Sequence, residues 1–279
     1  MRKIVFAFMC VIMTCLWGNT LLATENGELK LWLDFDGVKG QTFSDKTGSA
    51  QCSAKHLSIV DGALVSSSPI TDLRVQNSDH FHCEDELTVY AWMYMNSQSS
   101  YRTIIFKGDR SVKPEEVQFK LNAYDGHLQF LFKQSGPWQG IYWNPGENRY
   151  SVNGVDIETL PLKQWVQVAA VFNRGDITLY IDGKRVAEAR VKANKLWPNK
   201  APIQIGAAQA TGSTWPAYPF DGRLDDIRIY SKALDDTAIK ALFDQDKIDY
   251  ARRTTGKIKL SADTNSPKHG LFVVGDTVR

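Results

Sequence analysis

The sequence predicts an all-β domain: an antiparallel β-sandwich with a short C-terminal helix. Short segments in which apolar and polar residues alternate recur along the chain, and Gly-containing dipeptides such as Asp125-Gly126 and Asp182-Gly183 separate them. Helical spacing of apolar residues follows only the last of these segments. The chain does not alternate strands and helices as a parallel sheet requires, so an antiparallel sandwich is the class that fits.

The individual strands follow from their composition. Residues 29–35 alternate with Leu and Phe on one face, and residues 86–95 are rich in aromatic and β-branched side chains. Residues 164–172 are apolar on both faces, which predicts a central strand. Further strands are expected in the segments TIIFKG, VQFKLNAY, HLQFLF, DITLYI and KRVAEARV.

Residues 221–243 combine a strand with a helix. After the turn at Asp221-Gly222 the chain alternates, so that Asp225, Ile227 and Ile229 are expected on one face. Beyond Tyr230 the apolar period changes to that of a helix, with an aspartate placed to cap its first turn. A strand that leads directly into an amphipathic helix is typical of the last element of a domain.

This strand–helix segment resembles the C-terminal signature of laminin-G-like jelly-roll domains of the concanavalin A-like lectin/glucanase superfamily. Residues 165–169 with Tyr180 to Lys184 are similar to the family's central hairpin, Ala91-Trp92 to its first core strand, and Ile205-Gly206 to the strand before the closing element. The resemblance implies a concanavalin A-like jelly-roll β-sandwich over residues 24–247. It implies no single activity, because members bind sugars, calcium or proteins and some relatives are glycosidases.

Residues 1–23 have the layout of a secretory signal peptide. Arg2 and Lys3 precede an apolar run over residues 4–17, and small residues lead to a cleavage site expected after Ala23. The alternative is a membrane anchor, but the run is shorter than the roughly 20 residues that a span requires. We therefore expect a protein that is secreted, periplasmic or at the cell surface, with no membrane span after cleavage.

The charge and the cysteine content of the chain indicate which classes of partner it can bind and whether it can form a disulfide bond. Without Arg2 and Lys3, the basic residues equal the 31 acidic ones, and no basic stripe suggests a nucleic acid or an anionic membrane as partner. Cys52 and Cys83 are the cysteines outside the signal segment. In an oxidising compartment we expect them to form a disulfide bond, the alternative being two buried free thiols.

No motif predicts catalysis. A retaining glycosidase needs two carboxyl groups about 5 Å apart on one face, and the nearest candidate, Asp156-Ile157-Glu158, is flanked by loop-forming residues such as Pro161. His80 and His82 beside Cys83 lack the further ligands of a zinc site. Nucleophile-elbow, P-loop and dinucleotide-binding motifs are missing from the sequence. We expect a non-catalytic domain.

Two long segments, residues 136–161 and 197–220, interrupt the strand pattern and carry aromatic residues among Gly, Pro and Asn. Aromatic rings stack on the apolar faces of sugars while amide and carboxyl groups bond the hydroxyls. Alternatively, the rings pack these long loops onto the sandwich. The candidate ligand-binding residues are Trp138, Tyr142, Trp143, Trp215 and Tyr218.

Asp225 is a candidate ligand for a metal ion. If its carboxylate points inward with Ile227 and Ile229, it needs a metal, an arginine or several N–H donors. Relatives in the superfamily often hold a structural calcium ion where the first and last strands meet, which implies Asp36 as the matching oxygen ligand and Asp34 as the second choice. The alternative is a carboxylate bonded to backbone amides.

Residues 248–279 read as a linker followed by the start of another β module, or as a flexible end. Together the observations favour a secreted, non-catalytic module that binds an extracellular glycan, such as the accessory domain of a larger carbohydrate-active protein. The alternative is an extracellular protein-interaction or adhesion module with the same fold.

Overall fold

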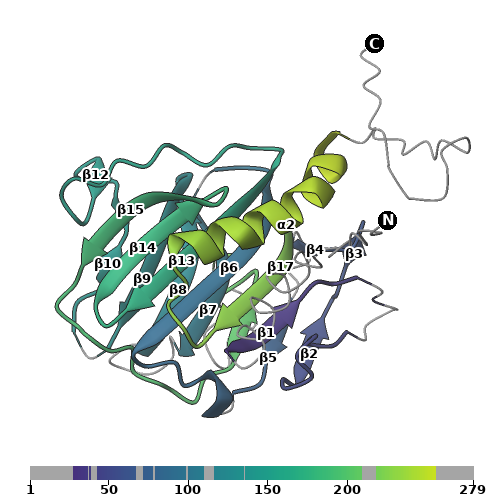
Figure 1. The fold of residues 1–279 in the computed structure, drawn as a ribbon, viewed down its shortest axis with the longest axis horizontal. Coiled ribbons are helices and arrows are strands. Elements are labelled where there is room, and N and C mark those ends of the chain that lie inside the picture. Colours follow the sequence, from purple (N-terminus) through teal and green to yellow (C-terminus); the bar gives the residue numbers. More distant parts are fainter. Residues whose placement is uncertain are drawn as a thin grey trace, which may run out of the picture.

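A computed structural model of the chain describes residues 28–36, 38, 43–66, 72–77, 79–98, 100–109, 116–134, 136–208 and 218–255. Two large antiparallel sheets lie one on the other, and a long helix, α2, crosses the outer face of one of them (Figure 1). The predicted all-β jelly-roll sandwich with a C-terminal helix is confirmed. The proposed signal peptide, residues 1–23, lies outside the described residues.

The first sheet has the order β15-β14-β13-β6-β17-β4-β3, and β1 also pairs with β17. Its central strands include β13, which confirms the central strand predicted for residues 164–172, and β6, which contains residues 86–95. The strands are β1 (Leu29–Leu33), β3 (Ile59–Val60), β4 (Ala63–Ser66), β6 (Glu86–Met95), β13 (Trp165–Asn173), β14 (Asp176–Ile181), β15 (Lys184–Arg190) and β17 (Gly222–Tyr230).

The second sheet has the order β10-β9-β8-β7-β16-β5-β2, and β11 pairs with β12 beside it. A single turn of 3-10 helix, η1 (Asp79–Phe81), precedes β6. The strands are β2 (Cys52–Lys55), β5 (Asp72–Val75), β7 (Tyr101–Asp109), β8 (Glu116–Tyr124), β9 (His127–Lys133), β10 (Gln139–Ile141), β11 (Trp143–Asn144), β12 (Arg149–Tyr150) and β16 (Ile203–Ile205).

The main core lies between the two sheets. Val89 and Val168 of the first sheet and Leu121 and Phe130 of the second are completely buried there. Each such side chain contributes roughly 1.5–3 kcal/mol relative to an exposed one. Because successive residues of a strand point to opposite faces, the neighbours of Leu121 and Phe130 point away from this core and form the outer face of the second sheet.

The predicted two-residue turns are present. Asp125 and Gly126 have φ of 49° and 81°, and Asp182 and Gly183 have φ of 50° and 71°. Two consecutive residues with positive φ define the hairpin turn that matches the twist of the strands. The first turn joins β8 to β9 and the second joins β14 to β15.

A second core lies between the first sheet and the helix α2 (Asp236–Thr255). Trp92 and Trp165 are buried under the helix and not between the sheets. The ring of Trp92 stacks on Tyr250 with centroids 4.0 Å apart and on Phe243 at 5.7 Å. The helix begins after Asp235, whose carboxylate accepts a bond from the Ala238 N–H at 2.8 Å.

The helix α2 continues past residue 247, where the sequence predicted the end of the domain, and ends at Thr255. Tyr250 is only 2 % exposed, and its contact with Trp92 explains why the helix continues through residues that the sequence assigned to a linker. The further β module that we expected at the end of the chain lies outside the described residues.

A bulge in β17 overturns the expected orientation of Asp225. Asp225 is paired with Trp92 and Arg228 with Tyr90, so the pairing register shifts between them, and Asp226 has a φ of 46°. The extra residue reverses the alternation. Asp225 therefore lies on the face of Trp92, toward α2, whereas Ile227 packs in the core between the sheets.

Cys52 and Cys83 are free thiols in the structure, so the expected disulfide bond is not formed. Cys52 begins the edge strand β2 and Cys83 follows η1, and both contact the main core. Burial raises the pKa of each thiol to about 11, which keeps both protonated at neutral pH and slow to react.

Candidate functional site

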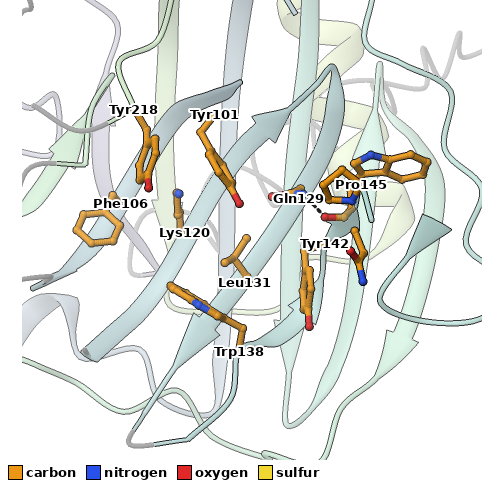
Figure 2. A pocket seen from close by; sticks show the side chains of 11 residues that line it. Tyr101, Phe106, Lys120, Gln129, Leu131, Trp138, Tyr142, Pro145 and Tyr218 are labelled. Carbon is orange, nitrogen blue, oxygen red and sulfur yellow. Dashed lines mark hydrogen bonds between the residues drawn. The ribbon is translucent and has the colours of Figure 1, made fainter. Parts of the chain in front are cut away.

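A groove of about 370 Å³ lies on the outer face of the second sheet (Figure 2). Its residues come from β7, β8, β9 and β11, from the segment around β10, and from the chain just before β17. It brings together residues that are far apart in the sequence. They are Tyr101, Phe106, Lys120, Gln129, Leu131, Trp138, Tyr142, Trp143, Asn144, Pro145 and Tyr218.

The floor of the groove is polar and fixed. Gln129 is 2 % exposed, and its Oε1 accepts a bond from Asn122 Nδ2 at 3.1 Å while its Nε2 donates to the Trp143 carbonyl at 3.3 Å. Asn122 Oδ1 is buried and has no hydrogen-bond partner in the structure. A buried amide oxygen without a partner carries a desolvation penalty.

Trp138 and Tyr142 flank the short strand β10. Gly140 allows this strand to approach β9 closely: it has a φ of 128°, and a Cβ atom at this position would lie 2.1 Å from the Phe130 carbonyl oxygen. The Ser151 N–H donates to the Tyr142 carbonyl at 2.7 Å, which fixes the next turn. The backbone therefore holds both rings against the outer face of the sheet.

Trp143 is partly packed onto the sandwich. Its ring stacks on His127 with centroids 3.7 Å apart and contacts Tyr150 edge to face at 5.4 Å. Burial lowers the pKa of His127, so the imidazole is neutral at pH 7. Part of the surface of Trp143 is thus used for packing, as the alternative interpretation of the aromatic loops expects, and part faces the groove.

Two tyrosine rings surround the amine of Lys120. The Nζ atom lies 4.8 Å from the centroid of Tyr101 and 5.0 Å from that of Tyr218, and Figure 2 shows it between the two rings. Tyr101 also stacks on Tyr124 at 4.0 Å. These contacts are cation–π interactions, which offset part of the desolvation of an ammonium group.

The structure brings four of the predicted ligand-binding residues into one groove: Trp138, Tyr142, Trp143 and Tyr218. All four are half-buried. Trp215 lies outside the described residues. The prediction missed the floor, above all Lys120 and Gln129. The sequence pattern that could have revealed them is the alternation of polar and apolar residues along β8 and β9. A sheet face that is simply exposed to solvent shows the same pattern.

The carboxylate pair that most resembled a glycosidase motif does not line the groove. Asp156 and Glu158 are exposed on an irregular segment between β12 and β13. Within the described part of the chain, the lining of the groove contains no aspartate or glutamate.

The two residues expected to hold calcium border a smaller cavity of about 180 Å³ beside α2, which also contacts Arg228. Asp36 is exposed, and Asp225 is 1 % exposed and accepts a bond from the Asp226 N–H at 2.8 Å. Among the described residues, no three His, Cys, Asp or Glu side chains are placed to hold a metal ion. The backbone amide is the partner that the alternative to calcium required, and the calcium site stays a prediction.

Comparison with known proteins agrees with this architecture. A laminin-G-type family model, that of the concanavalin A-like lectin/glucanases superfamily, matches residues 66–240. The chain therefore belongs to the concanavalin A-like lectin/glucanases superfamily. No curated protein gave a significant match. Among the described residues, no helix is both long enough and apolar enough to cross a bilayer.

Several solved structures have a similar fold. Domain 4 of AbnA, an extracellular GH43 arabinanase from Geobacillus stearothermophilus solved with arabinotriose, has a TM-score of 0.58 and 20% identity, over 77% of this chain and 98% of that one. Botulinum neurotoxin type C, whose cell entry depends on two ganglioside molecules, has a TM-score of 0.57 and 19% identity over 80% of this chain.

The binding domain of botulinum neurotoxin DC, solved with rat synaptotagmin II, has a TM-score of 0.55 and 19% identity over 79% of this chain. The present chain covers about half of the two neurotoxin chains, 52% of each. At these identities the likeness establishes the fold alone.

Proposed function

We propose that this protein is a non-catalytic carbohydrate-binding module and that the groove on the second sheet is its binding site. One observation carries the proposal: aromatic rings from separate loops gather in a single groove around the buried side-chain amide of Gln129, which is held by hydrogen bonds to Asn122 and to the Trp143 carbonyl. Sugars present apolar C–H faces and polar hydroxyl edges, and this lining offers a partner for each.

The groove residues divide into two roles. The rings of Trp138 and Tyr142 are half-buried and border the groove, so part of each ring can contact a bound sugar. The Asn144 side chain and the Lys120 amine supply hydrogen bonds to hydroxyl groups. The dimensions of the groove suit a short oligosaccharide better than a large ligand.

An extracellular, non-catalytic role is part of the same proposal. The support for export is the signal-like layout of residues 1–23. A non-catalytic role is supported by the described lining of the groove, which contains no carboxyl group, because glycoside hydrolysis requires two. The arabinanase domain solved with arabinotriose makes an accessory role in carbohydrate processing a reasonable proposal.

A protein-interaction or adhesion module is the second candidate. It is favoured by one neighbour of the same fold, the neurotoxin domain solved with rat synaptotagmin II. Aromatic side chains are also enriched at protein interfaces, so a peptide could use the same rings.

A glycan array with the full chain tests the proposal. We expect binding to a restricted set of glycans, and replacement of Trp138 or Tyr142 by Ala should weaken it by roughly 2 kcal/mol, the loss typical of a binding hot spot. The matched control is Tyr94→Ala, which removes a half-buried tyrosine from the first sheet.

Melting curves must accompany these measurements, because a ring that only packs the loop would lower stability without changing binding in the folded fraction. No binding to any glycan, or groove variants that bind as tightly as the Tyr94→Ala control, would overturn the carbohydrate proposal. The protein-interaction module would then be favoured.

A further inference from the structure

Lys120 contributes a positive charge to the groove. Lys120 is 6 % exposed, and it is the one ionised side chain among the described lining residues, which otherwise contribute aromatic, aliphatic and amide groups. A second amine, that of Lys133, lies 5.4 Å from the ring centroid of Trp138. The two lysines thus place positive charge at both the Tyr101–Tyr218 side and the Trp138 side of the groove.

The location of Lys120 makes its charge effective. Its neighbours in the groove are the rings of Tyr101 and Tyr218 and the side chain of Leu131, all of which limit the access of water. Charges act more strongly in such surroundings than at an open surface, because water screens them less. A neutral ligand would gain a hydrogen bond from the amine, whereas an anionic ligand would also gain the electrostatic attraction.

We propose that the natural ligand of the groove is an acidic saccharide whose anionic group lies next to Lys120. This inference rests on the proposed function, namely that the groove binds sugars, and it specifies the class of sugar. An ammonium group is a compact charge without the planar fork of a guanidinium, so it can donate hydrogen bonds to either a carboxylate or a sulfate. Lys133 would attract a second acidic sugar unit of the same saccharide toward Trp138.

The test compares matched ligands that differ only in charge. Calorimetry with the full chain would measure trigalacturonate against its methyl ester, and a sulfated carrageenan tetrasaccharide against its desulfated form. We expect one acidic ligand to bind roughly tenfold more tightly than its neutral partner, the factor of a charge-assisted hydrogen bond. The difference should shrink as salt is raised from about 0.05 M to about 0.5 M.

Two variants test whether the preference for the acidic ligand depends on the groove. Lys120→Met keeps the apolar stem of the side chain and removes the charge, so the ratio of acidic to neutral affinity should fall toward one. The matched control is Lys184→Met, which removes the same charge from the exposed hairpin between β14 and β15 and should leave the ratio as it is. If Lys120→Met fails to fold, the salt dependence of the wild-type protein still decides the question.

The outcomes separate the two proposals. Equal affinity for the charged and neutral members of both pairs would overturn the acidic-ligand inference and leave the carbohydrate-binding function in place. A preference that persists in Lys120→Met would also overturn it. Failure of both these ligands and a full glycan array to bind would overturn the proposed function itself.

Discussion

Arg228 on β17 is bonded to Asp246 on α2 through both terminal nitrogens of its guanidinium: Nη1 lies 3.1 Å from Oδ2, and Nη2 donates to Oδ1 at 3.1 Å. The two residues are 3 % and 8 % exposed. Nη2 also lies 3.0 Å from Asp226, and Asp246 accepts a bond from the Tyr90 hydroxyl at 2.9 Å. A buried ion pair therefore joins the last strand to the helix that covers it.

Replacing Asp246 by Ala should destabilise the domain by about 3 kcal/mol, since removing one member of a buried pair leaves its partner poorly compensated. Asp226 keeps one bond to Arg228, so the loss should lie near the lower end of the usual range. Chemical denaturation would measure it. Asp244→Ala is the control: it removes an exposed carboxylate from the same helix, and its unfolding curve should match the wild type. Equal stability of the two variants would contradict the prediction.

Stability should depend on pH through Lys107. Its buried amine donates to Asn77 Oδ1 at 2.6 Å and to the carbonyls of Asn199 and Ala201 at 3.2 and 2.9 Å. Burial nevertheless lowers its pKa to about 8 from 10.5. Between these values the unfolded chain binds more protons than the folded one, so the free energy of unfolding gains a term that rises with pH, by at most about 3 kcal/mol.

The measurement is urea unfolding of the wild type and Lys107→Met from about pH 7 to about pH 10.5. The difference between the two free energies should grow in favour of the wild type across this window. Curves that stay parallel would show that the amine keeps an ordinary pKa in the folded state.

The hairpin between β14 and β15 should tolerate little change at Gly183. It has a φ of 71°, and a Cβ atom there would lie 2.9 Å from the Cβ atom of Phe243 on α2. Gly154 has a similar φ of 78° but nothing within 4 Å, so Gly154→Ala reports the backbone strain alone, about 1–2 kcal/mol. Gly183→Ala should be less stable by a further 1–3 kcal/mol or so, the range for overpacking. Equal losses would mean that Phe243 moves aside freely.

A calcium ion held by Asp36 and Asp225 would stabilise the folded state, by about 2.7 kcal/mol at a calcium concentration one hundred times the dissociation constant. Addition of calcium should then raise the melting temperature, a chelator should lower it, and Asp36→Asn should abolish the response. A melting temperature that does not change on either addition would favour the alternative, in which hydrogen bonds such as the one from the Asp226 amide hold the Asp225 carboxylate.

The parts of the fold that depend on local chemistry could be predicted from the sequence. The turn at Asp182-Gly183 is an example, because two residues with positive φ require a small residue such as Gly in one position. The orientation of Asp225 could not, because one inserted residue in β17 reverses the faces without disturbing the local pattern of apolar residues. The end of α2 was missed because the packing of Tyr250 on Trp92 outweighs the polar residues that follow.

The candidate site shows the same division. Trp138, Tyr142, Trp143 and Tyr218 could be selected because aromatic residues are conspicuous in polar loops. Lys120 and Gln129 could not, since their meeting depends on the pairing of β8 with β9 and on the loops that border the groove. The contact of Lys120 with Tyr218 joins residues that are 98 positions apart in the sequence, which no local pattern reveals.

The two faces of the second sheet have separate tasks. Along β8 and β9, Leu121 and Phe130 hold the sandwich together, whereas Lys120, Gln129 and Leu131 line the groove on the opposite side. Substitutions at the lining positions therefore leave the packing between the sheets intact. The domain should accordingly accept a combinatorial library at these positions, and selection from such a library could redirect it to new sugars without redesign of its framework.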